Sequence, residues 1–205
     1  MSSDAGRPKK GPLIVISGPS GSGKSTLVRE VLKDSTLPLE VSISATTRKI
    51  RAGEIDGRDY YFWEKERFQE EAQKGAFLEW AEVYGNFYGT LKTEVESRRL
   101  RGKGVILEID VQGAGQIRQN GDITRSIFVL PPDWNACEAR LRARGTETEA
   151  TLAKRLESAR EEMRRSVEYD FQVVNDDLVK AVDKIKERSE EHTSELQSPM
   201  YLVCR

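Results

Sequence analysis

Residues 11–26 read GPLIVISGPSGSGKST, and this stretch decides the fold. Its apolar run, Leu13–Ile16, stops at a glycine-rich loop that satisfies the pattern G-x-x-x-x-G-K-[ST] without a mismatch. Gly18, Gly21 and Gly23 permit backbone dihedrals that a Cβ would forbid, so successive N–H groups can surround phosphate oxygens. After the loop, apolar residues recur at helical spacing: Leu27, Val28, Val31 and Leu32. A buried strand, a phosphate loop and a helix N-terminus together predict a nucleoside triphosphate site.

The loop residues have separate expected tasks. Lys24 is expected to reach the β- and γ-phosphates, and the Ser25 hydroxyl is expected to hold Mg²⁺. The helix that begins near Lys24 adds its positive dipole end. The residues expected to bind the triphosphate are Gly18, Pro19, Ser20, Gly21, Ser22, Gly23, Lys24, Ser25 and Thr26. The alternative is a glycine turn that only joins strand to helix, and the complete match to the pattern disfavours it.

Length and composition indicate one domain. The chain has 205 residues, of which 37% are hydrophobic, and its net charge is −1. No apolar run approaches the roughly 18–20 residues of a membrane span, and no signal peptide is evident. Two cysteines, Cys137 and Cys204, cannot form a disulfide framework or a metal cluster. We expect a cytoplasmic protein without nucleic acid or membrane partners. The sequence does not indicate a subunit interface or an oligomeric state.

Strand-like runs alternate with helical patterns, which is typical of a parallel α/β sheet. The runs are Leu13–Ile16, Val105–Ile109, Ile127–Leu130 and Gln172–Val174. About 90 residues separate the first two runs, so we expect an inserted lobe over 44–98. A second insertion, 137–167, is rich in arginine and glutamate and helical in pattern.

Both ends differ from the rest of the chain. Residues 1–10 are polar and basic, and we expect a disordered leader there. Residues 188–198 resemble the in-frame translation of a sequencing-library adapter, so 188–205 is interpreted as an artefactual tail rather than an ordinary polar one. His192, the one histidine, falls in that tail. Imidazole base catalysis is therefore not expected, which favours phosphoryl transfer by positioning and charge.

The inserted lobe carries a candidate phosphate-binding group. Arg48 and Arg51 lie three residues apart, and each guanidinium can place two N–H donors on a phosphate monoester. Tyr60 and Tyr88 can add hydroxyl donors. Taken singly, each arginine is more simply a solvated charge and each tyrosine a half-buried ring.

Five segments resemble successive motifs of the guanylate kinase family and occur in that family's order. They are SATTRKIRAGEIDGRDYYF (44–62), FLEWAEVYGNFYGT (77–90), ILEIDVQG (106–113), RLRARGTETE (140–149) and VVNDDL (173–178). The resemblance implies a P-loop, three-layer α/β fold with a parallel core sheet, a GMP-binding lobe and a helical lid. The core would comprise 11–43, 99–136 and 168–187, the lobe 44–98 and the lid 137–167. It also implies transfer of the γ-phosphoryl of ATP to GMP or dGMP, with Mg²⁺.

The resemblance also assigns acceptor residues. The GMP phosphate would be held by Arg48, Arg51, Tyr60 and Tyr88, with Ser44 and Thr90 near the base. Glu79 would read guanine, and chemistry supports this independently: guanine presents adjacent N1–H and N2–H₂ donors that one carboxylate can accept, whereas adenine does not. Ala45 stands where relatives carry a polar residue, and we expect a slight effect on acceptor binding.

Further residues are assigned to catalysis and to ATP. Asp110 follows a core strand, where ligands gather in such sheets, and it would serve either Mg²⁺ through water or the acceptor nucleotide. The lid arginines that would close over the triphosphate are Arg140, Arg144 and Arg155. Asn175 and Asp176 would border adenine. The remaining arginines of the segment, interpreted as solvated helix charges, are Arg142, Arg160, Arg164 and Arg165.

Two other classes of function remain open at this point. A non-catalytic guanylate-kinase-like module would use the GMP cleft for peptide partners, but we expect such a module to lack loop or lid residues that are present here. A P-loop kinase for another small phosphate acceptor is disfavoured by Glu79 beside the Arg48 and Arg51 pair.

Overall fold

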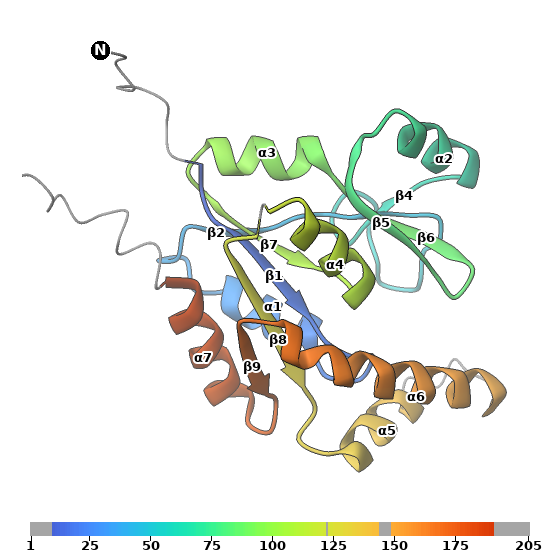
Figure 1. Ribbon diagram of the computed structural model, residues 1–205, viewed down its shortest axis with the longest axis vertical. Helices are drawn as coiled ribbons and strands as arrows, with labels where there is room; N and C mark the ends of the chain where they lie inside the picture. The colour runs from blue at the N-terminus through green and yellow to red at the C-terminus, as the bar shows by residue number, and fades with distance from the viewer. Residues whose placement is uncertain (1–9, 122, 144–148, 191–205) are drawn as a thin grey trace, which may run out of the picture.

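The structure, a computed structural model, describes residues 10–121, 123–143 and 149–190 (Figure 1). Its central sheet has five strands, all parallel, in the order β2-β7-β1-β8-β9. These strands are β1 (Leu13–Ser17), β2 (Leu39–Val41), β7 (Gly104–Glu108), β8 (Arg125–Leu130) and β9 (Phe171–Val174). The four predicted strands are confirmed to within two residues, whereas β2 was missed.

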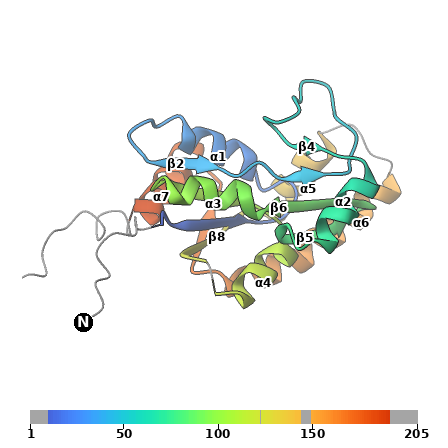
Figure 2. The ribbon, with the colours of Figure 1, turned by 90° about the horizontal axis from the view of Figure 1, so that it is seen from above.

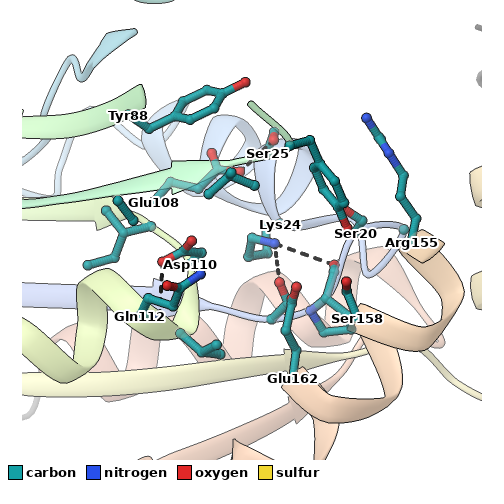
Figure 3. Close-up of a pocket in the computed structure, with 18 of the residues that line it drawn as sticks. Ser20, Lys24, Ser25, Tyr88, Glu108, Asp110, Gln112, Arg155, Ser158 and Glu162 are labelled. Atoms are coloured by element: carbon teal, nitrogen blue, oxygen red, sulfur yellow. Dashed lines mark hydrogen bonds between the residues drawn. The ribbon is translucent and has the colours of Figure 1, made fainter. Parts of the chain in front are cut away.

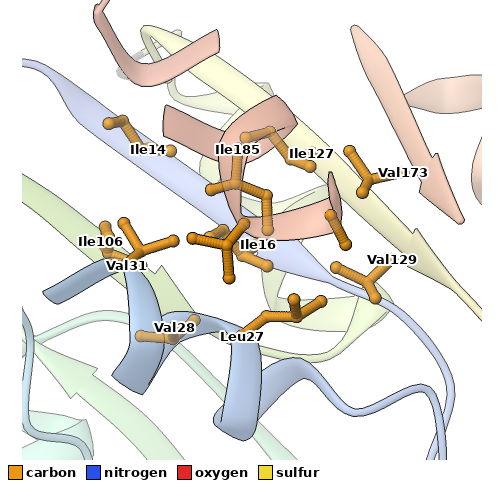
Figure 4. Close-up of a cluster of buried hydrophobic side chains, with 12 residues drawn as sticks. Ile14, Ile16, Leu27, Val28, Val31, Ile106, Ile127, Val129, Val173 and Ile185 are labelled. Atoms are coloured by element: carbon orange, nitrogen blue, oxygen red, sulfur yellow. The ribbon is translucent and has the colours of Figure 1, made fainter. Parts of the chain in front are cut away.

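Helices cover both faces of this sheet, which confirms the predicted three-layer fold (Figure 2). Side chains of β1 alternate: Ile14 and Ile16 pack in one buried cluster, and Leu13 and Val15 in the other. Figure 4 shows the first cluster, to which α1 (Lys24–Leu32) and α7 (Leu178–Glu190) contribute. Helices α3 (Lys92–Leu100) and α4 (Val111–Gln119) pack on the opposite face. Each fully buried aliphatic side chain stabilises the fold by about 1.5–3 kcal/mol.

The segment between β2 and α3 forms a second sheet in the order β4-β3-β6-β5 (Figure 1). Its elements are β3 (Ala45–Thr46), β4 (Tyr61–Phe62), α2 (Lys65–Gln73), β5 (Phe77–Val83) and β6 (Asn86–Leu91). Aromatic rings form its core, since Phe68 stacks on Phe77 and Phe87 at centroid distances of 4.4 and 5.4 Å. This sheet therefore has a hydrophobic cluster of its own.

The second insertion folds into α5 (Trp134–Arg142), α6 (Glu149–Arg164) and the short helix η1 (Arg165–Glu168). A small separate cluster joins α5 to α6 through Cys137, Leu141 and Leu152. The Cys137 sulfur lies 3.4 Å from the Ser20 carbonyl oxygen, so α5 touches the glycine-rich loop.

Helix α7 continues three residues into the segment that was interpreted as a tail. The Arg188 guanidinium lies 4.8 Å from the ring centroid of Phe171. Ser189 is 2% exposed, and its hydroxyl donates to the Ile185 carbonyl at 2.7 Å. Residues 1–9 of the expected leader and 191–205 of the expected tail lie outside the described residues.

The longest helix in the described ranges, α6, has 16 residues. None of the helices described here has the length and apolar character needed to cross a membrane.

Candidate active site

The glycine-rich loop follows β1 directly and adopts the conformation that the sequence predicts. Gly18 has a φ of +148°, and a Cβ there would lie 2.2 Å from the Val129 carbonyl oxygen. Gly23 has a φ of +91° and caps α1. The Lys24 ammonium donates to the carbonyls of Gly18 and Pro19 and so lies across the loop (Figure 3). Glycine is required here because a side chain would collide with the neighbouring strand.

A cavity of about 760 Å³ opens between the loop, the second sheet and α6 (Figure 3). The predicted site residues that line it are Gly18, Pro19, Ser20, Gly21, Gly23, Lys24, Ser25, Thr26, Ser44, Arg51, Tyr60, Glu79, Tyr88, Asp110 and Arg155. Those described but not in its lining are Ser22, Arg48, Thr90, Arg140, Asn175 and Asp176. The structure thus brings residues from the loop, the inserted lobe and the lid segment to one cavity.

Oxygen donors gather where the loop meets the end of β7. The Ser25 hydroxyl donates to Glu108 Oε1 at 2.5 Å. Asp110 caps α4, since its Oδ1 accepts from the backbone N–H groups of Gln112 and Gly113 at 3.0 and 2.8 Å. Within the described ranges, no three carboxylate, histidine or cysteine side chains could together hold a metal. A hydroxyl with one or two nearby carboxylates fits Mg²⁺, which keeps waters and binds substrate phosphates.

Glu79 is a buried carboxylate that faces the cavity. It is 5% exposed, and the Thr90 hydroxyl donates to its Oε1 at 2.6 Å. A Cβ on Gly113 would lie 2.3 Å from Oε2, so this glycine leaves room for the carboxylate. Burial raises the pKa of Glu79 to about 7, with Asp110 adding to the rise and the Thr90 bond opposing it. Thr90 therefore lies behind Glu79 and orients it.

The expected phosphate-binding arginines occupy different positions. Arg51 lines the cavity with Tyr60 and Tyr88, whose ring centroids are 6.0 Å apart. Arg48 instead forms a two-point ion pair with Glu54, at 2.9 and 2.8 Å, and its Cζ lies 5.4 Å from the Tyr60 ring centroid. Burial raises the pKa of Tyr60 to about 12, so its hydroxyl stays protonated and can donate. Arg48 is therefore not part of the cavity lining, but it contacts Tyr60, which is.

Arg140 and Asn175 hold the loop from outside the cavity. Arg140 Nη1 donates to the Ser22 carbonyl at 3.3 Å, and its Nη2 donates to the Asn175 carbonyl at 3.3 Å. Asn175 Nδ2 also donates to the Ser22 carbonyl, at 2.7 Å. Asp176 is exposed and accepts from its neighbour's backbone N–H. Arg144 lies outside the described residues.

Ala45, for which a slight effect on acceptor binding is predicted, does not line the cavity. Its side chain is fully buried in the aromatic cluster of the second sheet, whereas Ser44 before it lines the cavity. Side chains alternate along a strand, so Ala45 points away from the acceptor side.

Comparison with known proteins identifies the family of the chain. The family model described as guanylate kinase matches residues 10–192. A guanylate kinase from Synechocystis sp. is 50% identical over 176 residues, which cover 86% of this chain and 92% of that protein. The chain belongs to the guanylate kinase family. A guanylate kinase from Aliivibrio fischeri is 46% identical over 170 residues, 82% of either chain.

A solved guanylate kinase structure has the same fold. The crystal structure of guanylate kinase from Anaplasma phagocytophilum superimposes with a TM-score of 0.72 at 31% identity, over 94% of this chain and 89% of that chain. The resemblance inferred from the sequence motifs is therefore confirmed.

Arg165 and Glu162 are among the cavity residues of this guanylate kinase family member that were not predicted. Arg165 was interpreted as a solvated charge, but it lines the cavity while pairing with Glu168 at 2.8 Å. Glu162 points from α6 toward Lys24 (Figure 3). Burial raises the pKa of Glu162 to about 7, opposed by Lys24 and aided by Asp110. The signal was the helical spacing of four polar residues that all line the cavity: Arg155, Ser158, Glu162 and Arg165.

The other arginines of the segment are exposed helix charges, as predicted. Arg142 pairs with Glu138 at i,i+4, and Arg164 pairs with Glu161 at i,i+3. Arg160 lies with its Cζ 4.4 Å from the Trp134 ring centroid.

Proposed function

We propose that this chain transfers the γ-phosphoryl group of ATP to GMP, giving ADP and GDP, and so contributes to GTP supply in the cytoplasm. Membership of the guanylate kinase family supports the reaction. The observation that carries it is the buried carboxylate of Glu79 in the same cavity as a complete phosphate loop. We include dGMP as an acceptor because it carries the same base and phosphate.

At the acceptor end, Glu79 accepts from N1–H and N2–H₂ of guanine. Its Oε1 is already oriented by Thr90, so the carboxylate is positioned before GMP binds. A base without this pair of donors leaves the buried carboxylate unpaired, which is costly. Arg51, Tyr60 and Tyr88 bind the GMP phosphate, with Arg48 supporting the tyrosines.

At the donor end, the loop N–H groups and Lys24 bind the phosphates of ATP. An oxygen of the GMP phosphate attacks the γ-phosphorus in line as the bond to the β-phosphate oxygen breaks. Little covalent chemistry is left for side chains in such a transfer, so positioning and charge neutralisation dominate. Arg155 and Arg144 supply positive charge from the lid. Mg²⁺, held by Ser25 with Glu108 and Asp110 behind it, would neutralise charge on the phosphate oxygens.

We assign residues 44–98 to a GMP-binding lobe and 137–167 to a lid, with the core formed by 11–43, 99–136 and 168–187. Residues 1–10 and 188–205 are proposed to be dispensable apart from the helical turn that ends at Glu190. Lobe and lid carry groups for different substrates, so each must approach the core before transfer.

An ADP-release assay with ATP, Mg²⁺ and each nucleoside monophosphate tests the proposal. GMP and dGMP should give turnover well above AMP, CMP and UMP. Lys24→Ala should lower turnover at least about 100-fold while GMP binding is retained, because the lost charge acts on the transferred group. The matched control is Lys33→Ala at the C-cap of the same helix, where the ammonium pairs with Glu30 in solvent. Equal turnover with all acceptors would sink the proposal, and GMP binding without any turnover would favour a binding module.

A further inference from the structure

One contact between a guanidinium and an aromatic ring crosses the cavity. It joins the two segments that are proposed to bind different substrates. The Arg155 guanidinium of α6 lies over the Tyr84 ring, with its Cζ 4.8 Å from the centroid. Tyr84 occupies the turn between β5 and β6, and both residues line the cavity. Figure 3 shows Arg155 extending from α6 at the edge of that cavity. The contact therefore joins the proposed lid to the proposed GMP lobe.

The backbone of Tyr84 is unfavourable for a tyrosine. Its φ is +50°, and it is the one non-glycine residue of the described ranges with a positive φ. Gly85 follows with a φ of +78°, so the two-residue loop has the left-handed pair that hairpins usually fill with Asn-Gly or Asp-Gly. A tyrosine in this position costs backbone free energy relative to asparagine or glycine.

Packing within the lobe does not account for the tyrosine either. Tyr84 is 45% exposed and lies outside the aromatic cluster of the second sheet. Across the described part of the chain, it makes no ring–ring contact of the kind that joins Phe68 to Phe77. The ring contact that the structure does give it is the one with Arg155.

A contact between a guanidinium and the face of a ring leaves the N–H donors of Arg155 able to bind phosphate. A guanidinium that stacks on an aromatic ring uses its face, whereas its five N–H donors lie in its plane. We propose that Tyr84 is a positioning residue: its ring holds the plane of Arg155 so that the N–H edge is presented to the phosphates of ATP. Since Tyr84 belongs to the GMP lobe, a lobe that closes on GMP carries this ring with it and favours the active placement of Arg155. This proposal rests on the proposed function above.

Three substitutions in the full chain separate positioning from structure. Tyr84→Gly removes the ring but suits the positive φ, so the melting temperature should stay level or rise. With GMP saturating, its kcat/KM for ATP should nevertheless fall by about 2-fold to about 30-fold, the range expected for losing a cation–π contact. Tyr84→Phe keeps the ring face and should restore the parent value. In an Arg155→Ala background, Tyr84→Gly should have no further effect.

Binding of GMP alone provides the remaining readout. Its dissociation constant should be the same for Tyr84→Gly and the parent, because the ring acts on the donor side. Two results would overturn the positioning role while leaving the kinase assignment intact. The first is a kcat/KM for ATP in Tyr84→Gly that equals the parent value. The second is a loss in Tyr84→Phe as large as that in Tyr84→Gly. A parent chain that shows no GMP-dependent turnover would instead overturn both.

Discussion

Substituting Glu79 by glutamine should change stability and substrate binding in opposite directions. In the folded chain the pKa of Glu79 is about 7, against 4.5 for an unperturbed glutamate. The folded state therefore binds the proton more tightly than the unfolded state does. The stability that protonation contributes is complete below pH 4.5 and is lost as the pH rises through 7. One pKa unit corresponds to about 1.36 kcal/mol, so the ionised carboxylate costs the ligand-free fold about 3 kcal/mol at pH 8.

Glutamine is neutral at every pH and can still accept from the Thr90 hydroxyl. At pH 8, Glu79→Gln should therefore raise the melting temperature by roughly 5–10 °C, with little difference at pH 5. GMP binding should suffer, because two charge-assisted bonds to guanine are replaced by one neutral bond and a donor facing a donor. The KM for GMP should rise on the order of 100-fold.

Thermal unfolding without nucleotide at pH 5 and pH 8, with steady-state kinetics at pH 8, checks both parts. Glu82→Gln, which neutralises an exposed carboxylate on the same strand, is the control and should leave the pH dependence of melting unchanged. The reasoning is refuted if Glu79→Gln melts below the parent at pH 8, or if its difference from the parent is the same at both pH values.

Two further predictions follow, one from a close contact at Gly113 and one from the end of α7. Gly113→Ala would place a Cβ 2.3 Å from Glu79 Oε2, so the carboxylate must shift and the KM for GMP should rise at least about 10-fold. The control is Gly115→Ala, whose Cβ would have its nearest contact at 3.4 Å and which should leave the KM for GMP unchanged. A chain truncated after Glu190 should melt like the parent, but one truncated after Glu187 should melt a few degrees lower, because it loses a cation–π contact and a buried serine. Calorimetry of the two truncated chains distinguishes these outcomes.

The core strands were predictable because a parallel sheet buried on both faces reads as continuous apolar runs. Leu13–Ser17 is buried at every position, and its limits were found to within one residue. Strand β2 was not predicted because its three residues are only half-buried at the edge of the sheet. Strands β3 and β4 have two residues each, too few for any periodic signal.

The site was predictable as a set of residues but not as a set of contacts. The pattern of the loop specifies backbone geometry, so its glycines adopt the positive φ values that the sequence predicts, and Lys24 lines the same cavity. Whether the N–H donors of an arginine are already hydrogen-bonded within the protein depends on its partners in the tertiary structure. Arg48 and Arg51 look equivalent in the sequence, but Glu54 engages both terminal nitrogens of Arg48. Likewise, the contact of Arg140 with the loop depends on how α5 docks, which spacing alone does not encode.

Two carboxylates of the cavity have a raised pKa, and the cavity lining carries more acidic than basic side chains. Four basic side chains line it, against seven acidic ones: Glu79, Glu82, Glu108, Asp110, Glu157, Glu161 and Glu162. Burial is the main cause of the raised pKa at Glu79 and at Glu162, and the charge of Asp110 adds to both. Protons held there near neutral pH reduce the repulsion that two polyanionic nucleotides would meet. If Glu79 reads guanine as proposed, it must be ionised when GMP is bound. A triphosphate bound near Glu162 would instead favour keeping the proton on Glu162. The proposed function therefore predicts that Glu79 releases a proton when GMP binds, whereas Glu162 stays neutral when ATP binds.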